Sequence, residues 1–221
     1  MSGRVAFFDL DRTLIARNSA SLWIRWEWEG GRISKRQALQ AIGWVLRYNL
    51  GATELGGVLR RTVETLRGQI EAELRARTLE FYAARVRPTF RPGARLAVEA
   101  HRAAGDRLVL LTSASSYLAE AVRDELGFDD VVCNRFEVDA SGRYTGRALE
   151  PLCFGPGKVA LARRWAAASR VRLEDAAFYS DSRSDLPMLD AVGRPVVVHP
   201  DPRLRREARR RGWEIVSWGV P

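Results

Sequence analysis

The sequence predicts an α/β fold, in which a parallel sheet is interrupted after its first strand by a helical insertion. Three observations predict this fold. The chain opens with a short apolar run over residues 5–8, which is typical of a buried parallel strand. Residues 19–86 show helical periodicity without strand signals. From residue 94 onward, helical segments alternate with short apolar runs, which is typical of a parallel sheet with helices on both faces.

The length of 221 residues fits one domain with room for a second, smaller module. We expect the α/β part to comprise residues 1–16 and 88–221, and the helical insertion to form a domain of residues 17–87. With 46% hydrophobic and 29% charged residues, the composition excludes a disordered chain and a disulfide scaffold. No apolar stretch of the sequence reaches the roughly 18 residues needed to span a bilayer.

Within the insertion, polar residues indicate where helices begin. Ser34 and Thr53 are suitable N-caps for two helices, and a third helix is expected over residues 70–82. The Pro- and Gly-containing stretch of residues 87–93 then breaks the helical pattern.

The remaining elements alternate. We expect helices over residues 94–104, 117–126, 158–168 and 185–192, leading in turn to strands over residues 108–111, 131–132, 176–179 and 195–198. Residues 135–147, with Ser141 and Gly142 at their centre, predict a β-hairpin.

Polar residues follow three of the expected strands, at the edge where open parallel sheets bind their ligands. They are Asp9, Asp11, Thr112, Ser113, Asp181 and Asp185. Gathered carboxylates repel one another unless a cation neutralises them, and hard oxygen ligands with open positions suit Mg²⁺. The structural alternative is that aspartates at strand ends cap helices and turns, Asp185 in particular.

Asp9 and Asp11 are two residues apart, so on an extended chain their side chains point the same way. One carboxylate can then act as a nucleophile while the other serves as general acid and base. An aspartate that attacks a phosphate ester gives an acyl phosphate, which water then hydrolyses.

Four segments together resemble the signature of the haloacid dehalogenase-like hydrolases, and the resemblance covers the whole chain. The segments are Asp9-Leu10-Asp11-Arg12-Thr13, Leu110-Leu111-Thr112-Ser113, Gly157-Lys158 and Ser180-Asp181-Ser182-Arg183-Ser184-Asp185. The insertion has the position of a helical C1-type cap, and the order and lengths most resemble subfamily IB, the phosphoserine-phosphatase-like branch. The resemblance implies a Rossmann-like core with a cap that closes over the site.

The resemblance also implies the chemistry of the two leading acids. Asp9 is expected to be the nucleophile and an Mg²⁺ ligand. Asp11 is expected to be the general acid and base, with its backbone carbonyl on the metal. Because the dehalogenases of the family lack this second acid, Asp11 favours an Mg²⁺-dependent phosphatase. A phosphotransferase that passes the phosphoryl group from Asp9 to an alcohol is the alternative enzyme.

For the other motif residues the resemblance implies phosphate and metal binding. Thr112, with Ser113 beside it, and Lys158 are expected to hold phosphoryl oxygens. Asp181 is expected to bind Mg²⁺ directly, and Asp185 to bind it or to orient its waters. Lys158 is one of only two lysines among 36 cationic residues, which suggests that a compact charge is needed there. The alternative is an exposed lysine at the start of a helix.

Two positions depart from the phosphoserine phosphatases. Arg12 stands where that branch has serine, and Asn18 stands where it has a glutamate that binds the substrate's amino group. We therefore expect a small phosphorylated metabolite related to phosphoserine or histidinol phosphate, without transferring the specificity itself. Asn18 and Arg183 are expected to bind the substrate, together with Arg12 and Arg17, or else the arginines are surface residues.

The net charge of +9 raises the alternative of a nucleic-acid or membrane-surface binding module. No nucleic-acid motif supports it, and we expect no nucleic-acid partner. The excess lies in residues 19–92, with 13 cations and 7 acids, and in residues 203–211, with 6 cations and one acid. A basic insertion could draw a phosphorylated substrate inward.

Four tryptophans of the insertion have three interpretations. They are Trp23, Trp26, Trp28 and Trp44. They form the insertion's own core, a stacking surface for the leaving group, or a patch that touches a membrane surface. Cys133 and Cys153 are expected to be buried free thiols, and no signal peptide is visible, so we expect a cytoplasmic location.

Overall fold

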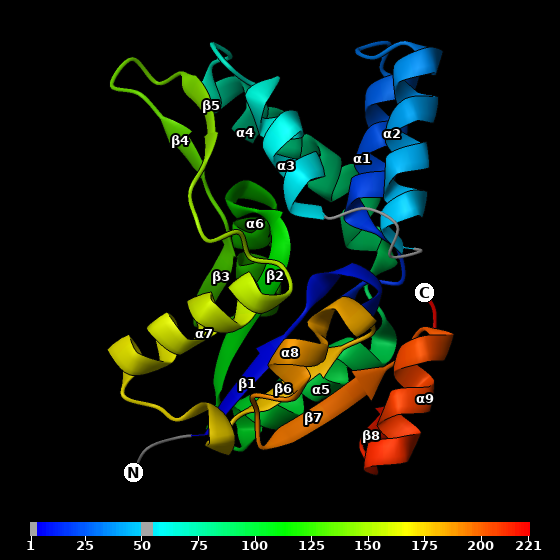
Figure 1. Cartoon of the computed structure of the whole chain (residues 1–221), viewed down its shortest axis with the longest axis vertical. Helices are drawn as coiled ribbons and strands as arrows, with labels where there is room; N and C mark the ends of the chain where they lie inside the picture. Colours follow the sequence, from blue (N-terminus) through cyan, green and yellow to red (C-terminus); the bar gives the residue numbers. More distant parts are fainter. Residues whose placement is uncertain (1–3, 50–54) are drawn as a thin grey trace.

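The computed structural model describes residues 4–49 and 55–221, and its centre is a six-stranded sheet (Figure 1). The strands lie in the order β3 (Asp130–Asn134), β2 (Arg107–Ser115), β1 (Val5–Phe8), β6 (Ala177–Ser180), β7 (Arg194–Val198) and β8 (Glu214–Val216). Every neighbouring pair is parallel. The predicted parallel α/β fold is therefore confirmed.

Helices cover both faces of this sheet (Figure 1). They are α5 (Pro92–Ala103) and α6 (Ser116–Leu126) on one face, and α7 (Pro156–Ser169), α8 (Leu186–Leu189) and α9 (Pro202–Arg211) on the other. Successive side chains of β1 alternate between the faces, so Phe8 packs with α5 and α6 whereas Phe7 packs with the other three helices. Both phenylalanines are completely buried, which fixes β1 at the middle of the molecule.

Among the described residues, four α-helices come directly after β1 and lie at the end of the molecule farthest from the N-terminus (Figure 1). They are α1 (Ser19–Glu29), α2 (Lys35–Asn49), α3 (Leu55–Glu64) and α4 (Glu71–Phe81). The predicted cap Ser34 begins α2, since its Oγ accepts a hydrogen bond from Gln37 N–H at 3.3 Å. Thr53, the other predicted cap, lies outside the described residues.

The predicted hairpin is also present, as β4 (Phe136–Val138) and β5 (Tyr144–Ala148). It packs beside the helical segment (Figure 1), and backbone hydrogen bonds join the two. Gly68 N–H donates to the Tyr144 carbonyl at 2.8 Å, and Glu71 N–H donates to the Gly142 carbonyl at 2.9 Å. The hairpin therefore connects the sheet to the helical segment.

The tryptophans of the helical segment are used differently from one another. The indoles of Trp23 and Trp26 lie against the ring of Phe81. The distance between ring centroids is 5.0 Å for Trp23 and 6.4 Å for Trp26. Trp28 is 46% exposed. The side chain of Trp44 is outside the described part of the structure. Trp23 and Trp26 thus contribute to the core of the helical segment, as the first of the three interpretations expects.

Three elements differ from the sequence expectation. The strand expected over residues 108–111 extends over Arg107–Ser115, so Thr112 and Ser113 lie inside β2 and do not follow it. The helix expected over residues 185–192 is wrong in extent, because residues 183–185 form a 3-10 turn and only Leu186–Leu189 is α-helical. The tight turn brings the Asp185 carboxylate to the site described below. The short edge strand β8 was not predicted, since Glu214 and Ile215 are exposed and give it no apolar pattern.

Replacing Gly193 by alanine is expected to destabilise the protein by about 1–3 kcal/mol, because the added methyl has no room. A Cβ at Gly193 would lie 1.8 Å from the backbone oxygen of Glu174. Urea unfolding measures the loss. The matched control is Gly43→Ala inside α2, where a Cβ meets nothing within 4 Å. That change is expected to stabilise by roughly 0.5–1 kcal/mol, and equal effects at the two positions would contradict the prediction.

The two cysteines are buried and free, as predicted. Burial raises the pKa of Cys133 to about 11 and that of Cys153 to about 12, so both thiols stay protonated and inert. None of the described helices combines the length and the apolarity needed to cross a membrane.

Candidate active site

The strand-end residues meet at one edge of the sheet, because β1 lies between β2 and β6. In the register of these strands, Phe8 is opposite Leu110 on one side and Tyr179 on the other. Asp9 therefore follows β1 near the level of Thr112, which lies within β2, and of Asp181, which follows β6. The sequence expectation that these residues share one edge of the sheet agrees with this arrangement.

Lys158 lies between two carboxylates at this edge. Its Nζ donates to Asp9 Oδ1 at 2.9 Å and to Asp185 Oδ2 at 2.8 Å. The hydroxyl of Ser180 also donates to Asp185 Oδ2, at 2.7 Å. Lys158 is only 2% exposed, and both carboxylates are buried. The lysine thus sits at the heart of the site and not on an exposed helix start.

Burial and charge act in opposite directions on this group. Burial raises the pKa of Asp9 to about 7, and the neighbouring Lys158 charge opposes the rise. For Lys158, burial works to lower its pKa, but the charges of Asp185 and Asp9 outweigh burial and leave it above its ordinary value. Lys158 is therefore a permanent cation beside Asp9.

The start of α7 brings Lys158 into this position. Pro156 opens the helix, where its fixed φ suits the first turn. A Cβ on Gly157 would lie 2.1 Å from the Leu152 carbonyl oxygen, so only glycine allows this close approach. Gly157 is therefore required by the close approach to Leu152, and the start of α7 places Lys158 next to Asp9 and Asp185.

Asp11 is tied to the beginning of the helical segment. Its Oδ1 accepts from Ser19 N–H at 2.7 Å, and its Oδ2 accepts from Asn18 Nδ2 at 3.3 Å. Asn18 is also the N-cap of α1, accepting from Ser21 N–H at 3.0 Å. Burial raises the pKa of Asp11, which favours a carboxyl group that can hold a proton. The side chain of Asn18, predicted to bind substrate, is engaged in these two structural contacts.

The backbone between the two aspartates and Thr13 turns sharply. Arg12 has φ +59° and ψ −5°, in the left-handed region. The turn brings Thr13 Oγ1 to 3.4 Å from Asp9 Oδ2. Arg91, which is 6% exposed, donates from Nε to the Arg12 carbonyl at 3.3 Å. Sequence reasoning missed Arg91, because an arginine before a proline looks like an ordinary loop residue. It named Ser180 as part of the fourth motif but assigned it no role.

Asp181 is the buried acid best suited to a metal. No described side chain or backbone group hydrogen-bonds to its carboxylate, which is 5% exposed. Burial raises the pKa of Asp181 well above its ordinary value, and the Asp9 and Asp185 charges raise it further.

The donor set at this edge fits Mg²⁺. Among the described residues, no three His, Cys, Asp or Glu side chains converge as a complete metal site. Mg²⁺ needs no such cage, because it binds through one or two carboxylates and keeps waters and substrate oxygens. Asp9 and Asp181, with the Asp11 carbonyl, fit this requirement. Asp185 contacts Lys158 and Ser180 through Oδ2, so its described contacts hold the lysine.

The other predicted substrate ligands are less directly engaged. Thr112 is buried, and its Oγ1 accepts from Ala114 N–H at 3.2 Å. Ser113 is half-buried, and its carbonyl accepts from Asn134 Nδ2. Arg183 is exposed, and its backbone N–H donates to Asp201 at 3.0 Å. Thr112, Ser113 and Arg183 thus lie toward the same edge of the sheet as Asp9, but none of them has a described contact with Asp9.

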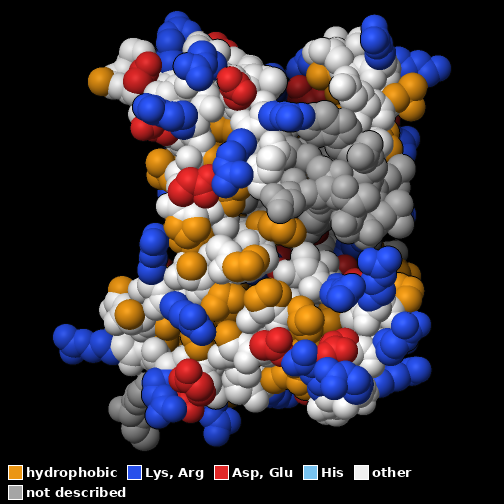
Figure 2. Space-filling model, viewed as in Figure 1, with side chains coloured by type: hydrophobic (Ala, Val, Ile, Leu, Met, Phe, Trp, Pro, Cys, Tyr) orange, Lys and Arg blue, Asp and Glu red, His pale blue; other side chains and the backbone are white. Residues whose placement is uncertain are grey.

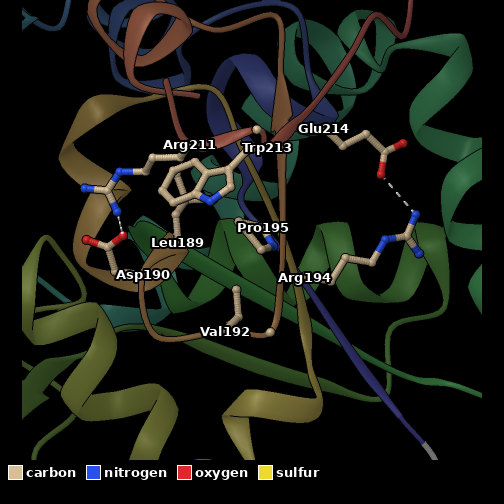
Figure 3. Close-up of a pocket in the computed structure, with 10 residues that line it drawn as sticks. Leu189, Asp190, Val192, Arg194, Pro195, Arg211, Trp213 and Glu214 are labelled. Atoms are coloured by element: carbon tan, nitrogen blue, oxygen red, sulfur yellow. Dashed lines mark hydrogen bonds and ion pairs between the residues drawn. The ribbon is translucent and has the colours of Figure 1, made fainter. Parts of the chain in front are cut away.

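A surface cavity of about 460 Å³ lies elsewhere, where β7 and β8 begin (Figure 3). Its charged side chains are paired with one another, Arg194 with Glu214 at 3.2 Å and Arg211 with Asp190 (Figure 3). The acids described above follow the opposite ends of their strands. This cavity is therefore separate from the candidate active site.

Basic side chains are spread over the visible face of the molecule, with acidic ones among them (Figure 2). Many arginines are paired, for example Arg25 with Glu29 at 2.6 Å and Arg60 with Glu150 at 2.8 Å. The positive charge on this face does not form one continuous band (Figure 2).

The fold and the site define an α/β protein whose buried acids and lysine meet at the carboxyl ends of parallel strands. Residues 6–190 match the family model of the haloacid dehalogenase-like hydrolases. The chain is 34% identical, over 98% of its length and 79% of the relative, to an inhibition of morphological differentiation protein of Streptomyces azureus. It is 29% identical, over 97% of its length and 98% of the relative, to a histidinol-phosphatase of Neisseria meningitidis.

Solved structures agree. A protein of unknown function from Bordetella pertussis has a TM-score of 0.88 and 32% identity, covering 98% of this chain and 99% of that one. A phospho-aspartyl intermediate analogue of phosphoserine phosphatase has a TM-score of 0.72 over 100% of this chain and 95% of that one, and its 18% identity supports the fold alone. The chain belongs to the haloacid dehalogenase-like hydrolases.

Proposed function

We propose that this hydrolase cleaves a small phosphomonoester, with Mg²⁺, through a phosphoryl group carried on Asp9. The enzyme is a phosphoric monoester hydrolase of its family, in line with relatives named histidinol-phosphatase and phosphoserine phosphatase. The observation that carries the proposal is the buried contact of Lys158 with Asp9 and Asp185, at 2.9 and 2.8 Å. It supports an anionic nucleophile held beside a fixed positive charge.

In the first step, an oxygen of Asp9 attacks phosphorus and the bond between phosphorus and the ester oxygen breaks. The leaving alkoxide takes a proton from Asp11, whose raised pKa suits a proton donor. Lys158 stays beside Asp9 and offsets negative charge on the transferring phosphoryl oxygens. The hydroxyl of Thr112, in the second half of β2, would bind one of these oxygens.

In the second step, water attacks phosphorus, and the now deprotonated Asp11 accepts the water's proton. The bond between the Asp9 oxygen and phosphorus breaks, which releases phosphate and restores both carboxyl groups. Bound Mg²⁺ would be held by Asp9, Asp181 and the Asp11 carbonyl, and would supply charge neutralisation and alignment of the phosphate.

Residues 17–87 are proposed to act as a cap on the core formed by residues 1–16 and 88–221. This proposal is supported by two hydrogen bonds that the Asp11 carboxylate accepts, from Asn18 Nδ2 and from Ser19 N–H, near the start of this segment. A movement of α1 would therefore change the hydrogen bonds of Asp11, the proposed acid and base. Closure over the site would exclude water during the first step.

The test of the proposed function is hydrolysis of p-nitrophenyl phosphate by the purified protein. We expect release of p-nitrophenol and phosphate, loss of activity on metal removal with EDTA, and recovery with Mg²⁺ but not with Na⁺. Addition of alcohols should leave phosphate as the main product. Activity that is unaffected by EDTA would remove the metal from the proposal, and transfer to an alcohol without phosphate release would indicate a phosphotransferase.

Mg²⁺ is expected to raise the melting temperature more at pH 8 than at pH 5. Burial raises the pKa of Asp9 to about 7 and the pKa of Asp181 well above its usual value. In the unfolded chain these carboxyls titrate near pH ~4. Their contribution to stability is thus full below that pH and is lost as the pH rises through the raised values. Mg²⁺ reverses this loss because it binds the deprotonated carboxylates.

Differential scanning calorimetry at the two pH values measures this effect. Asp181→Asn is expected to reduce the Mg²⁺-dependent shift at pH 8. A shift of the same size at pH 5 and pH 8 would contradict the assignment of these acids to the metal.

A further inference from the structure

The pairing of β2 with β3 is interrupted near the candidate active site. Leu111 is opposite Val132, and the next paired position is Ser115 opposite Asn134. Three residues of β2, 112–114, therefore lie against a single residue of β3, and we call these three residues the β2 bulge. Because the regular ladder is broken there, the backbone polar groups of the bulge need other hydrogen-bond partners.

Asn134, the last residue of β3, supplies such a partner. Its Nδ2 donates to the Ser113 carbonyl of the β2 bulge at 2.7 Å. Its Oδ1 accepts from Cys153 N–H at 2.8 Å. Asn134 is only 2% exposed, so both hydrogen bonds are shielded from water. One buried amide thus joins the bulge that contains Thr112 to the chain segment that leads to Lys158.

The segment of residues 152–158 is a series of tight turns that begins beside Asn134. Cys153 is completely buried. Phe154 N–H donates to the Leu152 carbonyl at 2.8 Å, and Gly157 N–H donates to the Phe154 carbonyl at 3.0 Å. Because these contacts follow one another without a break, a displacement of Cys153 would also displace Lys158 at the start of α7.

The separation between Thr112 and Lys158 depends on this arrangement. No hydrogen bond between described residues joins the two side chains directly. Their places are set by the two backbone segments that Asn134 links. A displacement of about 1 Å between groups that hold one reacting phosphate is enough to lower a rate about a hundredfold.

We propose that Asn134 is a positioning residue for phosphate binding, which holds the β2 bulge and the segment of residues 152–158 at a fixed separation. This role rests on the proposed phosphatase function, in which Thr112 and Lys158 hold phosphoryl oxygens. Asn134 acts through the backbone of Ser113 and Cys153 and does not itself bind the phosphate.

The experiment measures hydrolysis of p-nitrophenyl phosphate by Asn134→Leu, together with inhibition by inorganic phosphate. Leucine has a similar size but neither hydrogen-bonding group. We expect kcat/KM about tenfold to a hundredfold below wild type. The inhibition constant of phosphate should rise about tenfold or more. A residue that only stabilises the fold would lower the melting temperature and leave both constants of the folded enzyme near the wild-type values.

Asn134→Asp gives a second measurement, which lost packing does not imitate. A protonated carboxyl group can donate to the Ser113 carbonyl and accept from Cys153 N–H, as the amide does, whereas a carboxylate has no donor. Burial favours the protonated form. Relative to wild type, this variant should therefore have a higher kcat/KM at pH 5 than at pH 8. Asn134→Leu should show the same deficit at both pH values.

The matched control is Asp129→Ala, at the other end of β3. Asp129 directly precedes this strand, and its Oδ2 accepts from Leu108 N–H near the start of β2 at 2.7 Å. This variant therefore also loses a hydrogen bond from a side chain to the β2 backbone, but at the edge of the sheet opposite the candidate active site. It should leave kcat/KM and the phosphate inhibition constant near the wild-type values.

The inference is overturned if folded Asn134→Leu keeps both constants, if Asp129→Ala changes them as much, or if Asn134→Asp has the same deficit at pH 5 and pH 8. Should Asn134→Leu fail to fold, the comparison of Asn134→Asp at the two pH values decides alone. In these cases the wild-type enzyme still hydrolyses p-nitrophenyl phosphate and the proposed function stands. A wild-type protein without this activity would remove the proposed function and this inference with it.

Discussion

Asp9→Asn is expected to lower phosphomonoester hydrolysis by at least about a thousandfold, because an amide oxygen is a poor nucleophile. The variant keeps the size of the side chain at a position that is 6% exposed. Lys158 retains its contact with Asp185 at 2.8 Å, so the site keeps one of its two ion pairs. The loss should therefore appear in kcat, with the fold intact by circular dichroism.

The control for this substitution is Asp175→Asn, the same change in an exposed turn before β6. It is expected to leave kcat and KM near the wild-type values. If purified Asp9→Asn keeps more than a few percent of wild-type kcat while EDTA still inhibits it, another residue is the nucleophile.

Lys158→Met is expected to abolish activity and to destabilise the fold by about 3 kcal/mol at pH 8, because it leaves buried carboxylates without their cation. Lys158 is 2% exposed and contacts both Asp9 and Asp185. Without it, the pKa of Asp9, which burial already raises, loses the positive charge that opposes the rise. The destabilisation should therefore be smaller at pH 5, where Asp9 can take up a proton.

The chain supplies a matched control, because Lys35 is its other lysine and is exposed at the start of α2. Lys35→Met should change the free energy of unfolding by less than about 0.5 kcal/mol and leave activity near wild type. Equal destabilisation at both lysines, or a destabilisation by Lys158→Met relative to wild type that is no larger at pH 8 than at pH 5, would refute the buried ion-pair account.

Most of the sheet was predictable because its strands contain continuous apolar runs, whereas the helices between them show apolar residues at helical spacing. Phe7 and Phe8 of β1 are completely buried on opposite faces, which is what a continuous apolar run implies for a parallel strand. The edge strand β8 was not predictable in this way, since Ile215 is exposed and its neighbour Glu214 is charged. The hydrogen bonds to β7 that form it are not visible in a residue pattern.

The site was predictable at the level of which residues meet, and less so at the level of what they contact. The strand ends place Asp9 and Asp181 together because their strands are neighbours. The contact of Lys158 with Asp185 depends on a 3-10 turn over residues 183–185. The sequence pattern predicted a helix from residue 185 and did not predict this turn. The left-handed conformation of Arg12 could not be predicted from the sequence, because the residue usually found in this conformation is glycine.

The most direct test of the account is to find the phosphoryl group on the protein. Asp11→Asn should still react with p-nitrophenyl phosphate, since p-nitrophenolate leaves without a proton, but should release phosphate slowly. After acid quenching with ³²P-labelled substrate, we expect one labelled peptide, containing Asp9, whose label is lost to hydroxylamine and is absent from Asp9→Asn. Label on Thr13 or Thr112, or label that survives in Asp9→Asn, would contradict the account.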